Sequence, residues 1–113
     1  MIEIESIKLD DLREMSTKMS EPLVKGVVDV VLRKLVIDAG LHSDEEFFLL
    51  EQGSKQENLW GINLWLEYYG TDDFIEYDSM INIRPAQNNR SRGVENEETK
   101  KLIWEIVGEK INE

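Results

Sequence analysis

The sequence predicts an α+β fold in a single domain, with two N-terminal helices, a three-stranded antiparallel meander and a C-terminal helix. Three observations lead to this prediction. Apolar residues recur at helical spacing near both ends of the chain, a two-residue alternation occupies the middle, and the middle segments have short connections. A chain of 113 residues can bury a core of its own, so residues 1–113 are expected to form one domain.

The first twenty residues predict an edge strand followed by a helix. Residues 2–5 alternate isoleucine with glutamate, which is typical of a short strand at a sheet edge. Residues 9–20 place leucine and methionine at spacings of three and four, which predicts a short amphipathic helix. Ser20 is expected to end this helix and to cap the next one.

Residues 22–40 are rich in valine, but their charges favour a second, buried helix. Lys25, Asp29 and Arg33 are four residues apart and alternate in sign, as in a polar stripe along a helix. Gly40 suits the left-handed position that ends many helices. We therefore expect a central helix here.

The middle of the chain predicts the meander. Residues 47–50 form a continuous apolar run, and residues 60–66 alternate apolar and polar side chains. Residues 74–84 alternate again and end at Pro85, which cannot donate a hydrogen bond to a strand ladder. One face of this sheet is expected to pack on the helices.

The other face of the predicted sheet is polar and is a candidate contact surface. An exposed tryptophan there favours contact with a second copy of the chain, another partner, or the polar loop that follows. The alternative is an ordinary solvated face of an antiparallel sheet. The side chains expected on this face are Asn63, Trp65, Glu67, Glu76, Asp78, Asn82 and Arg84.

The C-terminal segment predicts a helix that Asn96 caps. Two glutamates follow in the first turn, where the helix dipole favours negative charge. Its buried stripe is expected to consist of Leu102, Ile103, Ile106 and Val107.

Composition excludes several classes of function. The net charge is −11, which argues against nonspecific nucleic-acid binding because that binding depends on basic residues. The absence of cysteine excludes disulfide scaffolds, thiolate metal sites and thiol nucleophiles, and it fits a reducing cytoplasm. Charges interrupt the longest apolar stretch, and the N-terminus lacks a secretory-signal pattern. We expect a cytoplasmic protein with no membrane span and no cofactor.

Residues 84–93, "RPAQNNRSRG", form a cationic, amide-rich segment that we call the arginine loop. No acidic residue occurs between Ser79 and Val94. Guanidinium groups suit carboxylate or phosphate, and turns rich in asparagine and glycine can expose successive N–H groups to an anion. The alternative is that the arginines neutralise carboxylates of the same chain. The predicted anion-binding residues are Arg84, Gln87, Asn89, Arg90 and Arg92, with Asn82 and Trp65 beside them.

A weaker candidate site follows Gly40. His42, Asp44 and Glu46 alternate, so in an extended chain they would share a side and could bind a divalent ion. No HExxH-type spacing supports this, and the expectation is no metal site. In an enzyme, His42, Glu51 or Asp78 would transfer a proton while the arginines stabilise phosphoryl charge.

Two resemblances extend these interpretations. The predicted element order is similar to that of small ribosome-dependent RNase toxins of toxin–antitoxin modules, although those toxins are typically basic. The segments "LHSDEEFFLLEQGSKQENLWG" and "YDSMINIRPAQNNRSRGVE" resemble a family of small bacterial and archaeal proteins classed as a domain of unknown function. Its most distinctive signature lies at Ile81–Pro85, Gln87 and Asn89–Ser91. This second resemblance implies one complete domain and no assigned activity.

The function predicted from these observations is binding without catalysis. The ligand would be an anionic small molecule or an acidic protein partner, and a homodimer is compatible with the exposed tryptophan. The chain's acidity would also suit a basic partner. The alternative is a phosphodiester hydrolase of the RNase type.

Overall fold

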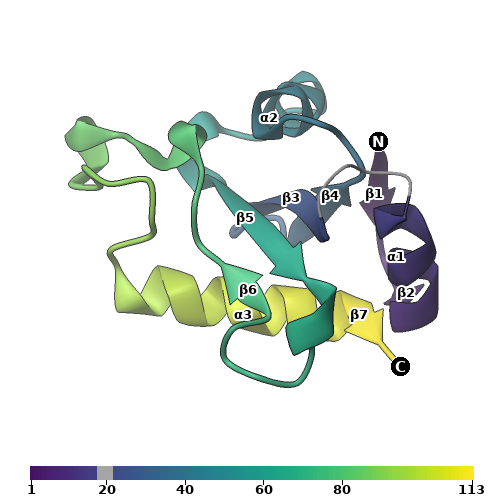
Figure 1. The fold of residues 1–113 in the computed structure, drawn as a ribbon. Coiled ribbons are helices and arrows are strands. Elements are labelled where there is room, and N and C mark those ends of the chain that lie inside the picture. Colours follow the sequence, from purple (N-terminus) through teal and green to yellow (C-terminus); the bar gives the residue numbers. More distant parts are fainter. Residues whose placement is uncertain (18–21) are drawn as a thin grey trace.

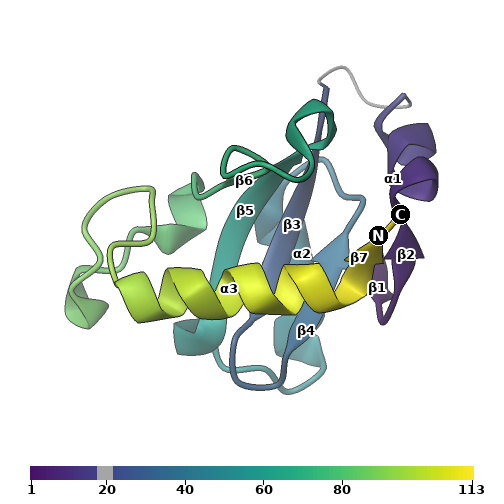
Figure 2. The ribbon, with the colours of Figure 1, turned by 90° about the horizontal axis from the view of Figure 1, so that it is seen from below.

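The computed structural model describes residues 1–17 and 22–113 and shows three layers. A β-sheet lies in the middle, with helix α2 (His42–Glu51) on one face and helix α3 (Glu97–Lys110) on the other (Figure 1). Figure 2 shows α3 running across the strands of the sheet. Helix α1 (Leu9–Ser16) lies beside the sheet, near the N-terminal strand.

The described residues form one antiparallel sheet of five strands and one small parallel pair. The order in the large sheet is β1 (Ile2–Ile4), β4 (Lys34–Ile37), β3 (Leu23–Asp29), β5 (Leu59–Trp65), β6 (Ile75–Glu76). The parallel pair joins β2 (Ile7–Lys8) to β7 (Ile111–Asn112). Short 3₁₀ helices occur at Gln56–Asn58, Leu66–Tyr68, Met80–Asn82 and Pro85–Gln87.

Apolar side chains fill both spaces between the layers. The larger cluster joins the sheet to α1 and α3 and includes Leu12, Val28, Ile62, Ile103 and Ile106. The smaller cluster lies under α2 and consists of Val27, Val36, Leu49 and Leu59. Strand β3 contributes to both clusters, so nearly all of its residues are buried.

The predicted helix over residues 22–40 is wrong, because this segment is the hairpin of β3 and β4. Residues four apart share one side of a strand as well as of a helix, so the charge spacing did not discriminate. The Asp29 carboxylate accepts hydrogen bonds from the N–H groups of Val31 and Leu32, both at 2.9 Å, and so forms the turn. Arg33 completes it in the left-handed conformation, with φ 55°.

The predicted meander is also wrong in two of its three strands. Residues 47–50 belong to α2, whose inner positions are half-buried or buried. The strand predicted over 60–66 is confirmed as β5. The strand predicted over 74–84 reduces to β6, after which the chain leaves the sheet.

A side chain replaces the missing strand beside β5. The buried Asn82 amide accepts from Gly61 N at 2.8 Å and donates to Gly61 O at 3.0 Å, as a neighbouring strand would. Ser79 packs so closely that a Cβ built on Gly61 would lie 2.6 Å from it. This close approach fixes the start of the segment that leads to the arginine loop.

The remaining element predictions differ in outcome. The edge strand near residues 2–5 is confirmed as β1, and the C-terminal helix is confirmed, with the Asn96 side chain accepting from Thr99 N. Helix α1 confirms a helix from Leu9, but the predicted end and cap at Ser20 lie outside the described residues. The α+β class therefore stands, while the element order that resembled RNase toxins is not observed.

None of the helices in the described part of the chain is both long and apolar enough to cross a membrane.

Candidate functional site

Polar side chains form a row across three strands on the α2 face of the sheet. Lys25 of β3 lies opposite Asn63 of β5, and Asn63 lies opposite Glu76 of β6. The Asn63 amide donates to a Glu76 carboxylate oxygen at 2.8 Å, and the Trp65 indole donates to the same oxygen at 3.2 Å. The prediction that Asn63, Trp65 and Glu76 share a surface is confirmed by these bonds.

His42 lies against this row at the start of α2. Its Nε2–H donates to the backbone oxygen of Ile62 at 2.7 Å, which leaves Nδ1 as an acceptor when the ring is neutral. Burial lowers the pKa of His42, and the charge of Lys25 lowers it further, while hydrogen bonding to Ile62 and Asn63 and the charge of Asp78 oppose the shift. The ring is therefore neutral at physiological pH and held in one tautomer.

The row continues from Glu76 to the arginine loop through Asp78. The backbone oxygen of Asp78 accepts from the Asn63 amide at 3.3 Å, and its carboxylate pairs with Arg92 at 2.6 Å. We call Lys25, His42, Asn63, Glu76, Asp78 and Arg92 the polar cluster.

Asn63 is the buried centre of the polar cluster. Its amide nitrogen is hydrogen-bonded, but its amide oxygen is buried and receives no hydrogen bond from the described residues. Buried acceptors are normally satisfied, because an unpaired one costs about 1–3 kcal/mol. The arrangement therefore suits a donor group supplied by a ligand.

The arginine loop is built largely from contacts within the chain. Arg84 donates to the backbone oxygens of Gln56 and, at 2.6 Å, Leu59, and its guanidinium lies 4.2 Å from the centre of the Trp60 ring. Gln87 donates to the Glu57 oxygen at 2.9 Å. These two predicted ligand-binding residues therefore anchor the loop to the start of β5.

Two buried asparagines hold the loop together. Asn89 donates to the backbone oxygens of Asn82 and Gly93, both at 2.8 Å, and accepts from Glu95 N at 2.9 Å. Asn82 also donates to Arg92 O at 2.9 Å. Their predicted place beside the loop is confirmed, but all their contacts here are internal.

A carboxylate of the chain occupies the predicted anion position. Glu95 accepts from the N–H groups of Arg90 at 2.7 Å and Ser91 at 2.9 Å. The hydrogen bonds from Ser91 and then Arg90 lower the pKa of Glu95. The two N–H groups thus have the geometry to bind a carboxylate oxygen. The Arg90 side chain is exposed and forms no ion pair within the described residues.

The weaker candidates do not converge. His42, Asp44 and Glu46 lie on a helix, where a spacing of two puts Asp44 on the exposed side. Glu46 is half-buried; burial raises its pKa, and hydrogen bonding to Gln56 and the charge of Arg84 oppose this. Glu51 is exposed at the end of α2. Among residues 1–17 and 22–113, no three histidine or acidic side chains are placed to bind a metal ion.

The sequence interpretation missed Lys25 and misplaced His42. Lys25 was assigned to a helix stripe, although its half-buried amine donates to Gly40 O at 3.1 Å beside the polar cluster. The signal for His42 was its position three and seven residues before Glu45 and Leu49, which are the buried side of α2.

Comparison with known proteins identifies a family. No curated protein and no solved structure matches the chain. The model of the family described as "Protein of unknown function (DUF5674)" matches residues 1–110. The match covers nearly the entire sequence and confirms the resemblance to a domain of unknown function. The chain therefore belongs to the DUF5674 family of proteins of unknown function.

Proposed function

We propose that this protein is a ligand-binding domain whose site is the polar cluster together with Arg90, and that the ligand carries an anionic group. The observation that carries the proposal is the buried, unpaired amide oxygen of Asn63 between charged groups of both signs. A ligand that donates to Asn63 and presents its anion to the arginines would satisfy both ends of the cluster.

The anionic group is assigned to the arginine-loop end of the cluster. There the carboxylates of Asp78 and Glu95 bind the Arg92 guanidinium and the loop N–H groups. Both contacts are solvent-exposed, and exposed ion pairs contribute only about 0–1 kcal/mol. A phosphate with charge near −2 could therefore compete with them.

The test is a thermal-shift titration with inorganic phosphate, sulfate and nucleoside monophosphates. The wild-type protein should be stabilised in a saturable way, since a ligand that binds only the folded state raises its melting temperature. Replacing Arg90 and Arg92 with alanine should abolish the shift. Replacing Arg13, an exposed arginine of α1 paired to Asp10, is the matched control and should leave the shift unchanged. A wild-type protein that none of these anions stabilises would contradict the proposal.

A second candidate function is hydrolysis of a phosphate ester, and His42 favours it. A neutral imidazole fixed by a backbone oxygen is the arrangement expected of a general base, because the second ring nitrogen is free to accept a proton. Asp78 and Arg92, which are bonded to each other, would then lie at the phosphoryl end.

The hydrolase candidate is tested with bis(p-nitrophenyl) phosphate and p-nitrophenyl phosphate. Release of p-nitrophenolate should be lost in His42→Asn and retained in Glu51→Gln, which changes an exposed carboxylate on the same helix. If wild type and His42→Asn do not differ, binding without catalysis is the better description.

A further inference from the structure

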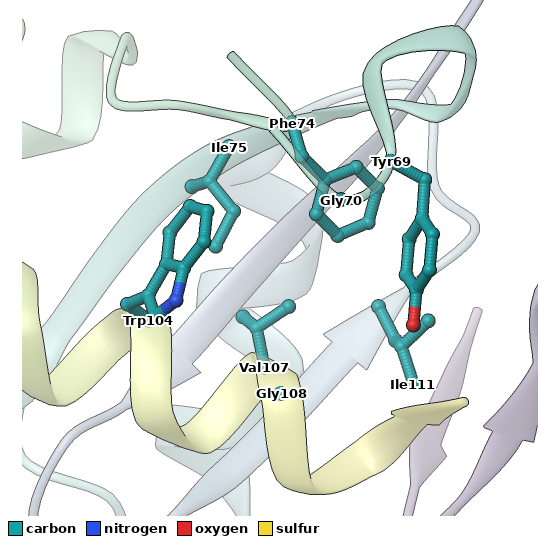
Figure 3. Close-up of a pocket in the computed structure, with 8 residues that line it drawn as sticks. All are labelled: Tyr69, Gly70, Phe74, Ile75, Trp104, Val107, Gly108 and Ile111. Carbon is teal, nitrogen blue, oxygen red and sulfur yellow. The ribbon is translucent and has the colours of Figure 1, made fainter. Parts of the chain in front are cut away.

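An apolar groove lies on the face of the molecule opposite the polar cluster. It runs between α3 and the segment that leads from β5 to β6, and its volume is about 180 Å³ (Figure 3). Figure 3 shows the Trp104 indole at one end of the groove and Phe74 with Tyr69 at the other, with Val107 and Gly108 on the helix side. Trp104 is 41% exposed, which is unusual for so large an apolar side chain.

An acidic hollow adjoins the groove at the edge of the sheet. The two share Ile75, and the hollow has a volume of about 340 Å³. Its remaining lining combines two aromatic side chains with three carboxylates: Trp65, Tyr68, Asp72, Asp73 and Glu76. No basic side chain lines it among the described residues.

We propose that the groove and the acidic hollow together dock a basic segment of a partner protein. One large apolar side chain of that segment enters the groove, and a neighbouring lysine or arginine enters the hollow. Aromatic faces beside carboxylates attract such cations both by their ring electrons and by charge. The groove is sized for one side chain, so the adjoining hollow provides the selectivity.

Charge complementarity decides which occupant fits. The chain carries a net charge of −11, so a second copy placed on this surface would bring like charge to a surface already rich in carboxylates. An acidic segment is disfavoured for the same reason. A basic segment gains attraction at the acidic hollow and buries Trp104 in the same step.

The probe is a short, capped peptide with one leucine between two lysines, titrated into ¹⁵N-labelled protein and followed by NMR. Saturable shifts should be confined to residues 65–76 and 104–111. A peptide with alanine in place of leucine should bind about tenfold more weakly, as expected for a lost apolar side chain. A peptide with glutamate in place of lysine should not bind.

Gly108 offers a blocking variant that should fold. A Cβ added there meets no atom within 4 Å, so leucine at this position extends into open space and occupies the groove. Gly108→Leu should weaken the lysine–leucine peptide by about tenfold or more. Gly40→Leu is the matched control, because Gly40 is equally open but lies away from the groove. Replacing Asp72 and Asp73 with asparagine should weaken binding, whereas Asp44→Asn with Glu51→Gln removes the same charge elsewhere and should not.

Three results would overturn the proposal. They are the absence of saturable shifts, peptide binding by Gly108→Leu equal to wild type, and a dimer in solution that Gly108→Leu dissociates. The last would assign the groove to a second copy. The phosphate titration of Gly108→Leu should match wild type, so failure here is distinct from failure of the proposed function.

Discussion

Glu45 should make the protein less stable as pH rises through the neutral range. This glutamate lies on the inner side of α2 and is fully buried. One carboxyl oxygen accepts from Ala39 N at 3.3 Å, and the other has no partner among the described residues. Burial raises the pKa of Glu45 from 4.5 to about 9, although the Ala39 hydrogen bond opposes the shift.

The direction of the effect follows from where the proton is bound. Between the two pKa values the folded protein keeps the Glu45 proton and the unfolded chain releases it. Each pH unit in that window lowers the free energy of unfolding by about 1.4 kcal/mol. From about pH 5 to about pH 8 the loss is at most about 4 kcal/mol, since local rearrangement that admits water would limit it.

The perturbation is Glu45→Gln, which keeps the shape and stays neutral at every pH. The assay is urea unfolding of both proteins at several pH values between about 5 and 8. The two should be similar in stability near pH 5, and the variant should become progressively more stable than wild type above it. Glu51→Gln, which changes an exposed glutamate of the same helix, should show no such trend. A stability difference that stays constant with pH would refute the reasoning.

Three further predictions concern the arginine loop and its support. Asn82→Ala should lower the free energy of unfolding by about 2–4 kcal/mol in urea, because it leaves the buried backbone groups of Gly61 unpaired; a loss below that of an exposed asparagine control would contradict this. Gly61→Ala should cost about 1–3 kcal/mol by the same assay, because its Cβ would lie 2.6 Å from Ser79, and relief by Ser79→Gly in a double-mutant cycle should confirm the cause. Glu95→Ala should enlarge the thermal shift that phosphate induces, because it frees the N–H groups of the loop; an unchanged shift would exclude them from the anion site.

The sequence predicted the α+β class, the central strand and the ends of the fold, because there a single pattern operated. Strand β5 alternates cleanly, and α3 has both a capping asparagine and an apolar stripe. The order of the sheet could not be predicted, since it depends on which segment fills its middle. That segment was residues 22–40, where the valines indicated a strand and the charges were taken to indicate a helix.

Helix α2 escaped prediction because polar side chains occupy its buried side. His42, Glu45 and Leu49 follow helical spacing, but only Leu49 is apolar, and Phe47 is exposed. An apolar pattern therefore could not mark the buried face. The same substitution of polar for apolar residues brings His42 to the polar cluster, so the failure of the pattern coincides with the candidate site.

The candidate site was predicted in part. The polar face of β5 and β6 was expected from alternation, and Asp78 was expected near it. Lys25 could not be placed there until β3 was known to lie beside β5. The arginine loop was correctly located, but charge counting could not show that Arg84 turns inward, since its partners are backbone oxygens that carry no sequence signal.

The internal contacts of the arginine loop bear directly on what the loop can bind. Arg84, Asn82 and Asn89 are committed to backbone groups, so they make the loop rigid and are not free to meet a ligand. Rigidity lowers the ordering cost of binding, and it leaves Arg90 and Arg92 as the cations that can exchange partners. The carboxylate of Glu95 already lies where an external anion would bind. An anion that binds here must therefore displace a tethered competitor, which favours phosphate over singly charged ions and explains how so acidic a chain can keep a cationic loop at its surface.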